Sequence, residues 1–127
     1  SIDWAKQTLT EDPLIVQNFV AEHQKELIGM VTIRRDRGVK SQHQAHITRV
    51  YIKPEWRGQG IINTFMQACI TWAQQHNIII LKLAVTCTNT AAIRAYNRLG
   101  FNIYGTDPKC LYLNGEYYDE YLMSREL

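Results

Sequence analysis

The segment that decides the fold, residues 46–85, reads HITRVYIKPEWRGQGIINTFMQACITWAQQHNIIILKLAV. Its first part, 46–53, is a strand candidate that ends at Pro54. Between 60 and 76 apolar residues recur at the spacing of one helical face, namely Ile62, Phe65, Met66, Cys69, Trp72 and Ala73. The run 78–85 is almost continuously apolar, which is typical of a central strand covered on both faces. The segment therefore predicts a βαβ unit.

The residues on either side add strands and one helix. Segments 15–21 and 27–33 are rich in β-branched residues and predict a hairpin, which a polar, basic loop at 34–40 follows. A second helix is predicted from Asn89, whose side chain can cap the first amides, to the residue before Gly100.

The C-terminal part of the chain is predicted to be all strand. Residues 101–104 begin one strand, and segments 109–113 and 116–123 flank Asn114 and Gly115, a strong hairpin-turn signal. The whole order implies an α/β or α+β domain whose mixed, mostly antiparallel sheet is flanked by helices. With 127 residues, the chain is long enough for one domain, spanning 1–127.

Composition excludes several classes of protein. Hydrophobic residues make up 46% and charged residues 20%, so intrinsic disorder is not expected. The net charge of +2 does not favour nucleic acid, and no apolar run approaches the length of a membrane span. Three widely spaced cysteines suggest neither a disulfide framework nor a metal site. We expect a soluble protein of the reducing cytoplasm, without a metal.

The turn between the first strand and the first helix of the βαβ unit is a candidate anion site. Gly58 and Gly60 let the backbone approach a ligand closely, and no side chain stands at the helix start to cap its free amides. Arg57 adds a positive charge beside them. This pattern fits a pyrophosphate cradle, and an ordinary glycine-rich turn is the alternative.

Two motifs in the segment 50–101 together resemble those of GNAT-type N-acetyltransferases. One is VYIKPEWRGQG, with its Arg-x-x-Gly turn, and the other is NTAAIRAYNRLGF, with the pattern Asn-x-x-Ala-x-x-x-Tyr-x-x-x-Gly-Phe. The resemblance implies the acyl-CoA N-acyltransferase fold and acetyl-CoA as co-substrate. It covers about half of the chain strongly and is absent at the N-terminus.

The resemblance also implies roles for particular residues. The turn residues Arg57, Gly58, Gln59, Gly60, Ile61 and Ile62 match those that hold the pyrophosphate, and Val50, Tyr51 and Ile52 match the strand beside the pantetheine arm. Asn89 and Ala92 match positions that line the coenzyme. Tyr96 matches the residue that protonates the departing thiolate in many members. A buried core aromatic with a satisfied hydroxyl is the alternative for Tyr96.

The sequence departs from the family pattern at two places. Ile62 stands where the family usually has Gly or Ala, and we expect its side chain to turn toward the apolar face of the helix while its amide faces the phosphate. The family also opens with a strand and helices, whereas this chain is expected to begin near their end, at 1–10. We therefore expect the N-terminal strand and first helix to be lacking, through truncation or natural reduction.

Neither motif determines the general base that accepts the amine proton. His46 is the candidate, because its ordinary pKa suits the task, although a histidine on a strand is often structural. Three acidic residues after the hairpin turn are candidates for attracting a cationic amine, or form a solvated strand end: Glu116, Asp119 and Glu120. Cys87 could lie near the thioester, or be a small buried residue.

The leading hypothesis is direct transfer of an acetyl group from acetyl-CoA to a primary amine of a small molecule, peptide or protein. A non-catalytic CoA-binding or interaction module with the same fold is the alternative. A nucleic-acid surface made by Arg34, Arg35, Arg37 and Lys40 is the third hypothesis, but no aromatic residue is interleaved with them, and a solvated loop is more ordinary. The sequence leaves a homodimer open.

Overall fold

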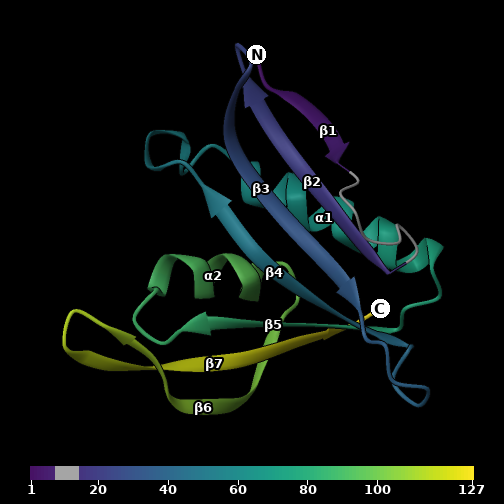
Figure 1. Cartoon of the computed structure of the whole chain (residues 1–127), viewed down its shortest axis with the longest axis vertical. Helices are drawn as coiled ribbons and strands as arrows, with labels where there is room; N and C mark the ends of the chain where they lie inside the picture. The colour runs from purple at the N-terminus through teal and green to yellow at the C-terminus, as the bar shows by residue number, and fades with distance from the viewer. Residues whose placement is uncertain (8–14) are drawn as a thin grey trace.

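The computed structural model describes residues 1–7 and 15–127, which form one seven-stranded sheet and two α-helices (Figure 1). The strands lie in the order β1-β2-β3-β4-β5-β7-β6. Their bounds are β1 Asp3–Gln7, β2 Val16–His23, β3 Glu26–Arg35, β4 Gln44–Ile52, β5 Ile80–Thr86, β6 Asn102–Leu113 and β7 Glu116–Glu126. The helices are α1 Ile61–Gln75 and α2 Thr90–Arg98, and a 3-10 turn covers Pro54–Trp56.

The predicted βαβ unit is confirmed as β4, α1 and β5. β4 and β5 pair in parallel, and every other pair among the described strands is antiparallel. The predicted β2–β3 hairpin and mixed sheet are also confirmed. Asn114 and Gly115 both have positive φ, at 52° and 81°, as a type I′ hairpin turn requires.

The predicted absence of an N-terminal strand was wrong. β1 pairs antiparallel with β2, from Asp3 opposite Glu22 to Gln7 opposite Asn18. Trp4 gives this strand a partner in the core, because its ring makes an edge-to-face contact with Phe65 at 5.5 Å. The predicted lack of a first helix concerns the segment between β1 and β2, and residues 8–14 of that segment lie outside the described residues.

Two further segment predictions needed correction. The segments predicted at 101–104 and 109–113 belong to one strand, β6, whose register shifts between Asp107 and Leu111. This irregularity accommodates Pro108 on the edge of the sheet, where a missing N–H is tolerated. Arg34 and Arg35, predicted to lie in the loop, are the last residues of β3.

α1 holds the core together by burying one face against the sheet. Its buried residues are Ile61, Phe65, Met66, Cys69, Ile70, Trp72 and Ala73. They pack against apolar side chains from β2 to β5 and against Tyr96 of α2. Ile62 is half-buried and packs against the same core, as predicted from its place on the helix.

The sheet opens between β4 and β5. Their ladder has three pairs and ends at His46 opposite Lys82, although both strands continue. Beyond that point β4 contains a bulge, because Thr48 opposes Thr32 while Tyr51 opposes Met30. A bulge bends its strand and increases the local twist. The two strands diverge, with α2 between their ends in the view of Figure 1.

Candidate active site

A cavity of about 600 Å³ lies on the helical side of this opening. The end of β4, the following turn, the start of α1 and one side of α2 line it. Its residues are Val50, Tyr51, Ile52, Trp56, Arg57, Gly58, Gly60, Ile61, Ile62, Asn63, Asn89, Ala91, Ala92, Ala95, Tyr96 and Arg98. Two motifs that are distant in the sequence therefore meet around one space.

The turn that leads into α1 leaves backbone amides available in the cavity. Gly60 is the residue before the helix, has φ of 80°, and supplies no side-chain cap. The N–H of Thr64 bonds to the Gly60 carbonyl, so the three amides between them have no partner within the helix. The first turn of α1 carries no acidic residue, which keeps the positive end of the helix dipole uncompensated.

Arg57 ties the turn to the strand that precedes it. Its Nε donates a hydrogen bond to the Ile52 carbonyl at 3.0 Å, while the residue as a whole stays exposed beside the cavity. Arg57 and the first residues of α1 line the same cavity. Trp56, just before Arg57, contacts the His23 ring of β2 in a tilted arrangement, with 4.8 Å between ring centroids, which attaches the turn to a neighbouring strand.

α2 contributes a buried tyrosine to the wall of the cavity. Asn89 caps this helix, as predicted, by accepting the Ala92 N–H at 3.2 Å. Tyr96 is 5% exposed, and its hydroxyl makes no hydrogen bond with the residues that the structure describes. Burial, together with the nearby Cys69, raises the pKa of Tyr96 to about 12. The phenol therefore keeps its proton at neutral pH.

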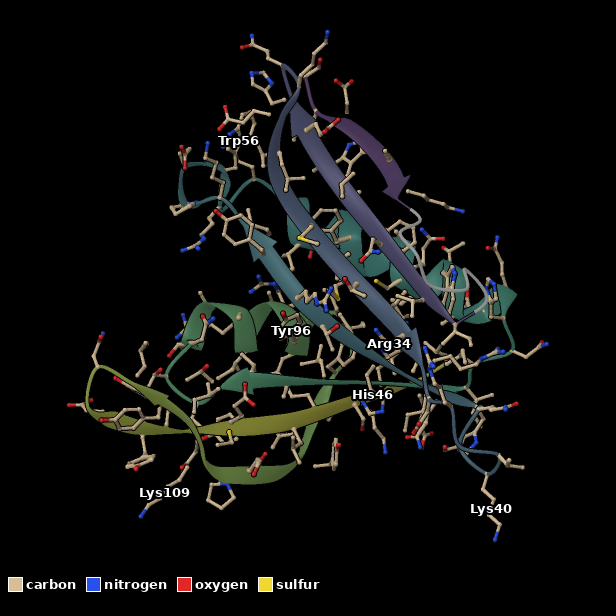
Figure 2. The ribbon with its side chains drawn as sticks, viewed as in Figure 1. Arg34, Lys40, His46, Trp56, Tyr96 and Lys109 are labelled. Carbon is tan, nitrogen blue, oxygen red and sulfur yellow. The ribbon has the colours of Figure 1, made fainter. Side chains whose placement is uncertain are left out.

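All but two of the residues predicted to hold the coenzyme or to transfer a proton line the cavity. Gln59 and His46 do not line the cavity. His46 lies on β4 in the last pair with Lys82, and its Nε2 is 3.9 Å from an oxygen of Asp36. Figure 2 shows Trp56 at one end of β4, Tyr96 on α2, and His46 toward the other end of β4.

The candidates from the C-terminal half lie outside the cavity. Cys87 follows β5, is half-buried, and donates its backbone N–H to the Asp119 carbonyl. Asp119 accepts the Lys109 N–H at 2.8 Å, so its carboxylate holds the irregular part of β6. Glu116 accepts the Tyr118 hydroxyl, and Glu120 accepts the Cys110 thiol, which gives both acidic groups a contact within the hairpin.

Sequence reasoning missed five lining residues: Trp56, Asn63, Ala91, Ala95 and Arg98. Three of them follow helical spacing on α2, since Ala95 and Arg98 stand four and seven residues after Ala91. Periodicity therefore contained the signal for these three. Trp56 and Asn63 lie directly before and after the predicted turn. Their place in the cavity wall depends on how the turn folds, which the sequence does not indicate.

Among the described residues, no helix is both long and apolar enough to cross a bilayer. No group of three or more His, Cys, Asp or Glu side chains gathers within that part of the chain in a way that could hold a metal ion.

Comparison with known proteins identifies the family. Residues 2–101 match the family model described as Acetyltransferase (GNAT) family. The chain is 30% identical over 124 residues to the L-amino acid N-acetyltransferase AaaT of Escherichia coli (strain K12), covering 94% of this chain and 74% of that protein. It is 32% identical over 113 residues to the N-alpha-acetyltransferase daf-31 of Caenorhabditis elegans, covering 87% and 60% respectively.

Solved structures agree with this family. A GNAT-family acetyltransferase from Streptococcus pneumoniae superposes with a TM-score of 0.82 at 25% identity, over 90% of this chain and 68% of that one. An IAA acetyltransferase from Bacillus cereus ATCC 14579 superposes over the full length of both chains with a TM-score of 0.81, and at 16% identity this likeness shows the fold. The chain belongs to the GNAT family and is an N-acetyltransferase.

Proposed function

We propose that the cavity binds acetyl-CoA and that the protein transfers the acetyl group to a primary amine. Three unpaired amides, the helix dipole and Arg57 converge at the start of α1, which suits a pyrophosphate. The β5-facing edge of β4 beyond His46 has no strand partner, so its backbone groups can bond to the amides of the pantetheine arm. The side chain of Ile62 packs against the core, which leaves its amide for the phosphate.

The chemical step is a direct attack of the amine on the thioester carbonyl carbon. A C–N bond forms, the C–S bond breaks, and the departing thiolate takes the proton of the Tyr96 hydroxyl. A covalent cysteine intermediate is not favoured, because burial raises the pKa of Cys69 to about 12 and Cys87 does not line the cavity. His46 stays our proposed base for the amine proton, acting from the sheet face opposite the helices.

The observation that carries this function is the meeting of a proton donor and an anion cradle in one cavity. The Tyr96 hydroxyl has no described hydrogen-bond partner, which is expected of a group that awaits a ligand rather than of a satisfied core aromatic. A purely structural CoA-binding module has no need of such a buried phenol. We therefore favour the enzyme over the non-catalytic alternative.

The relatives offer two kinds of acceptor for this chain. One is named an L-amino acid N-acetyltransferase and another an N-alpha-acetyltransferase, so small-molecule and protein amines both enter the proposal. We also propose a cytoplasmic location, since Cys110 is an exposed, unpaired thiol that suits a reducing compartment. A homodimer stays a prediction, and light scattering of the purified protein tests it.

The function is tested by following release of free thiol from acetyl-CoA in the presence of a panel of amines. We expect amine-dependent thiol release, and a melting temperature that rises with millimolar acetyl-CoA because the ligand binds the folded state. A raised melting temperature without thiol release from any amine would support the non-catalytic module. An unchanged melting temperature would refute the coenzyme site itself.

A further inference from the structure

A row of basic side chains crosses the sheet on the face turned away from the helices. Arg34 of β3 lies opposite His46 of β4, and His46 lies opposite Lys82 of β5. Their sequence neighbours Ile33, Ile47 and Leu81 are buried in the core that packs against α1. Because side chains alternate along a strand, the basic row faces the other way. Figure 2 shows Arg34 and His46 next to each other at this place.

This row stands at the edge of the opening in the sheet. His46 and Lys82 form the last pair of the β4–β5 ladder, and the strands diverge beyond them. If acetyl-CoA fills the cavity on the helical side, the acceptor amine has to approach from the opposite face, through the opening. Lys82 borders that path. The next residue of β5 on the same face is Ala84, about 6.6 Å further along the strand, whose small side chain leaves room beside the opening.

The ammonium group of Lys82 has no carboxylate partner in the part of the chain that the structure describes. Its Nζ lies over the ring of Tyr104, 5.5 Å from the ring centroid. Glu126 lies opposite Ile80, which precedes Lys82 by two residues and is further from the opening. Glu126 makes no ion pair with Lys82. His46 differs, because Asp36 stands 3.9 Å from its ring. Lys82 therefore presents an uncompensated positive charge beside the opening.

A cation on this path selects among amines by charge. It repels an acceptor whose own charge is only positive, such as a polyamine or a lysine side chain. It attracts an amine that carries an anion close by. In a free α-amino acid the carboxylate and the amine share one carbon atom, whereas the first residue of a peptide or protein has a neutral carbonyl at that position. The charge therefore favours a free amino acid over a protein N-terminus.

We propose that Lys82 binds the α-carboxylate of a free amino acid and thereby determines the acceptor class of the enzyme. The inference rests on the proposed function and adds the acceptor to it. With the carboxylate held at Lys82, the amine two bonds away is directed to the opening where β4 and β5 part. The Tyr104 ring beside the ammonium helps to hold the lysine in place.

The test compares free L-amino acids with the corresponding amino acid amides, which keep the amine and side chain and lack the carboxylate. Each pair is assayed by thiol release with the wild type, Lys82→Met, Lys82→Arg and Lys40→Met. Methionine keeps most of the lysine stem without its charge, and arginine restores the charge. Lys40 is an exposed lysine of the β3–β4 loop and serves as the matched control.

We expect the wild type to prefer the acid over the amide, and Lys82→Met to raise KM for the acid at least tenfold while kcat/KM for the amide stays within twofold. A tenfold change corresponds to about 1.4 kcal/mol of lost interaction. Lys82→Arg should recover most of the loss, and Lys40→Met should behave as the wild type. Equal use of acid and amide by the wild type, or equal losses on both in Lys82→Met, would overturn the assignment and leave the acetyltransferase function intact. No thiol release with either member of any pair, nor with a peptide amine, would refute the proposed function and the assignment together.

Discussion

Replacing Gly60 by alanine separates coenzyme binding from backbone strain. Gly60 has φ of 80°, and a Cβ built there meets no protein atom within 4 Å. The added methyl group therefore extends into open space at a residue that lines the cavity. The turn bearing Gly115 provides a matched control, because that residue has φ of 81°, equally empty surroundings, and no place in the cavity wall.

The cost in stability should be the same at both glycines. A left-handed conformation costs a residue with a Cβ roughly 1–2 kcal/mol, and the lower entropy of unfolded alanine offsets roughly 0.4–1 kcal/mol of it. We expect each variant to lose about 1 kcal/mol of unfolding free energy. For a chain of this length that lowers the melting temperature by about 4 °C.

The effect on acetyl-CoA should differ between the two variants. At Gly60 the methyl group comes between the backbone and the bound pyrophosphate, so at least one charge-assisted hydrogen bond of about 1.5–3 kcal/mol is lost. The Kd for acetyl-CoA should rise about 10- to 100-fold in Gly60→Ala and stay unchanged in Gly115→Ala. Calorimetric titration with acetyl-CoA measures both values. If Gly60→Ala loses stability as expected but its Kd for acetyl-CoA is unchanged, the phosphates do not lie against this turn.

Three further predictions concern the helices and the core. Tyr96→Phe should lower kcat about 100-fold or more, because the thiolate loses its proton donor, while the melting temperature and acetyl-CoA affinity stay close to those of the wild type; equal turnover in steady-state assays would reduce Tyr96 to a packing residue. Burial raises the pKa of both Cys69 and Tyr96 to about 12, from ordinary values of 9.0 and 10.0. The folded protein therefore holds these protons more tightly than the unfolded chain does, and its stability should fall as the pH rises above about 9. Urea unfolding at pH 8 and pH 10.5 measures this fall, which should be smaller in Cys69→Ala, and a pH-independent stability would contradict the buried thiol. Asn89→Ala removes the hydrogen bond to the Ala92 N–H and should lower the free energy of unfolding by about 1 kcal/mol in the same assay. An unchanged free energy of unfolding would show that water replaces the cap fully.

Local patterns in the sequence were sufficient for the elements that carry the site. Helical spacing from Ile62 to Ala73 predicts α1, and the apolar run that follows predicts β5, because amphipathic periodicity reflects which face of an element is buried. Asn89 and the Asn114–Gly115 turn act through their own backbone and the next few residues, so their roles could also be predicted. β1 was missed because its pairing with β2 depends on partners that are distant in sequence, including Phe65.

The site itself needed the tertiary structure. Sequence motifs select Arg57 and Tyr96, but their meeting around one cavity depends on the divergence of β4 and β5, which a bulge near Arg49 accompanies. The separation of His46 from that cavity, and its alignment with Lys82, depend on which residues of β4 and β5 pair. Register and bulges arise from the packing of a whole sheet, in which a shift of one residue reverses every side chain. The amino-acid sequence by itself determined the helices, the glycine turn and the family, because these follow from neighbours along the chain, whereas contacts between distant strands decided which charges lie beside the opening between β4 and β5.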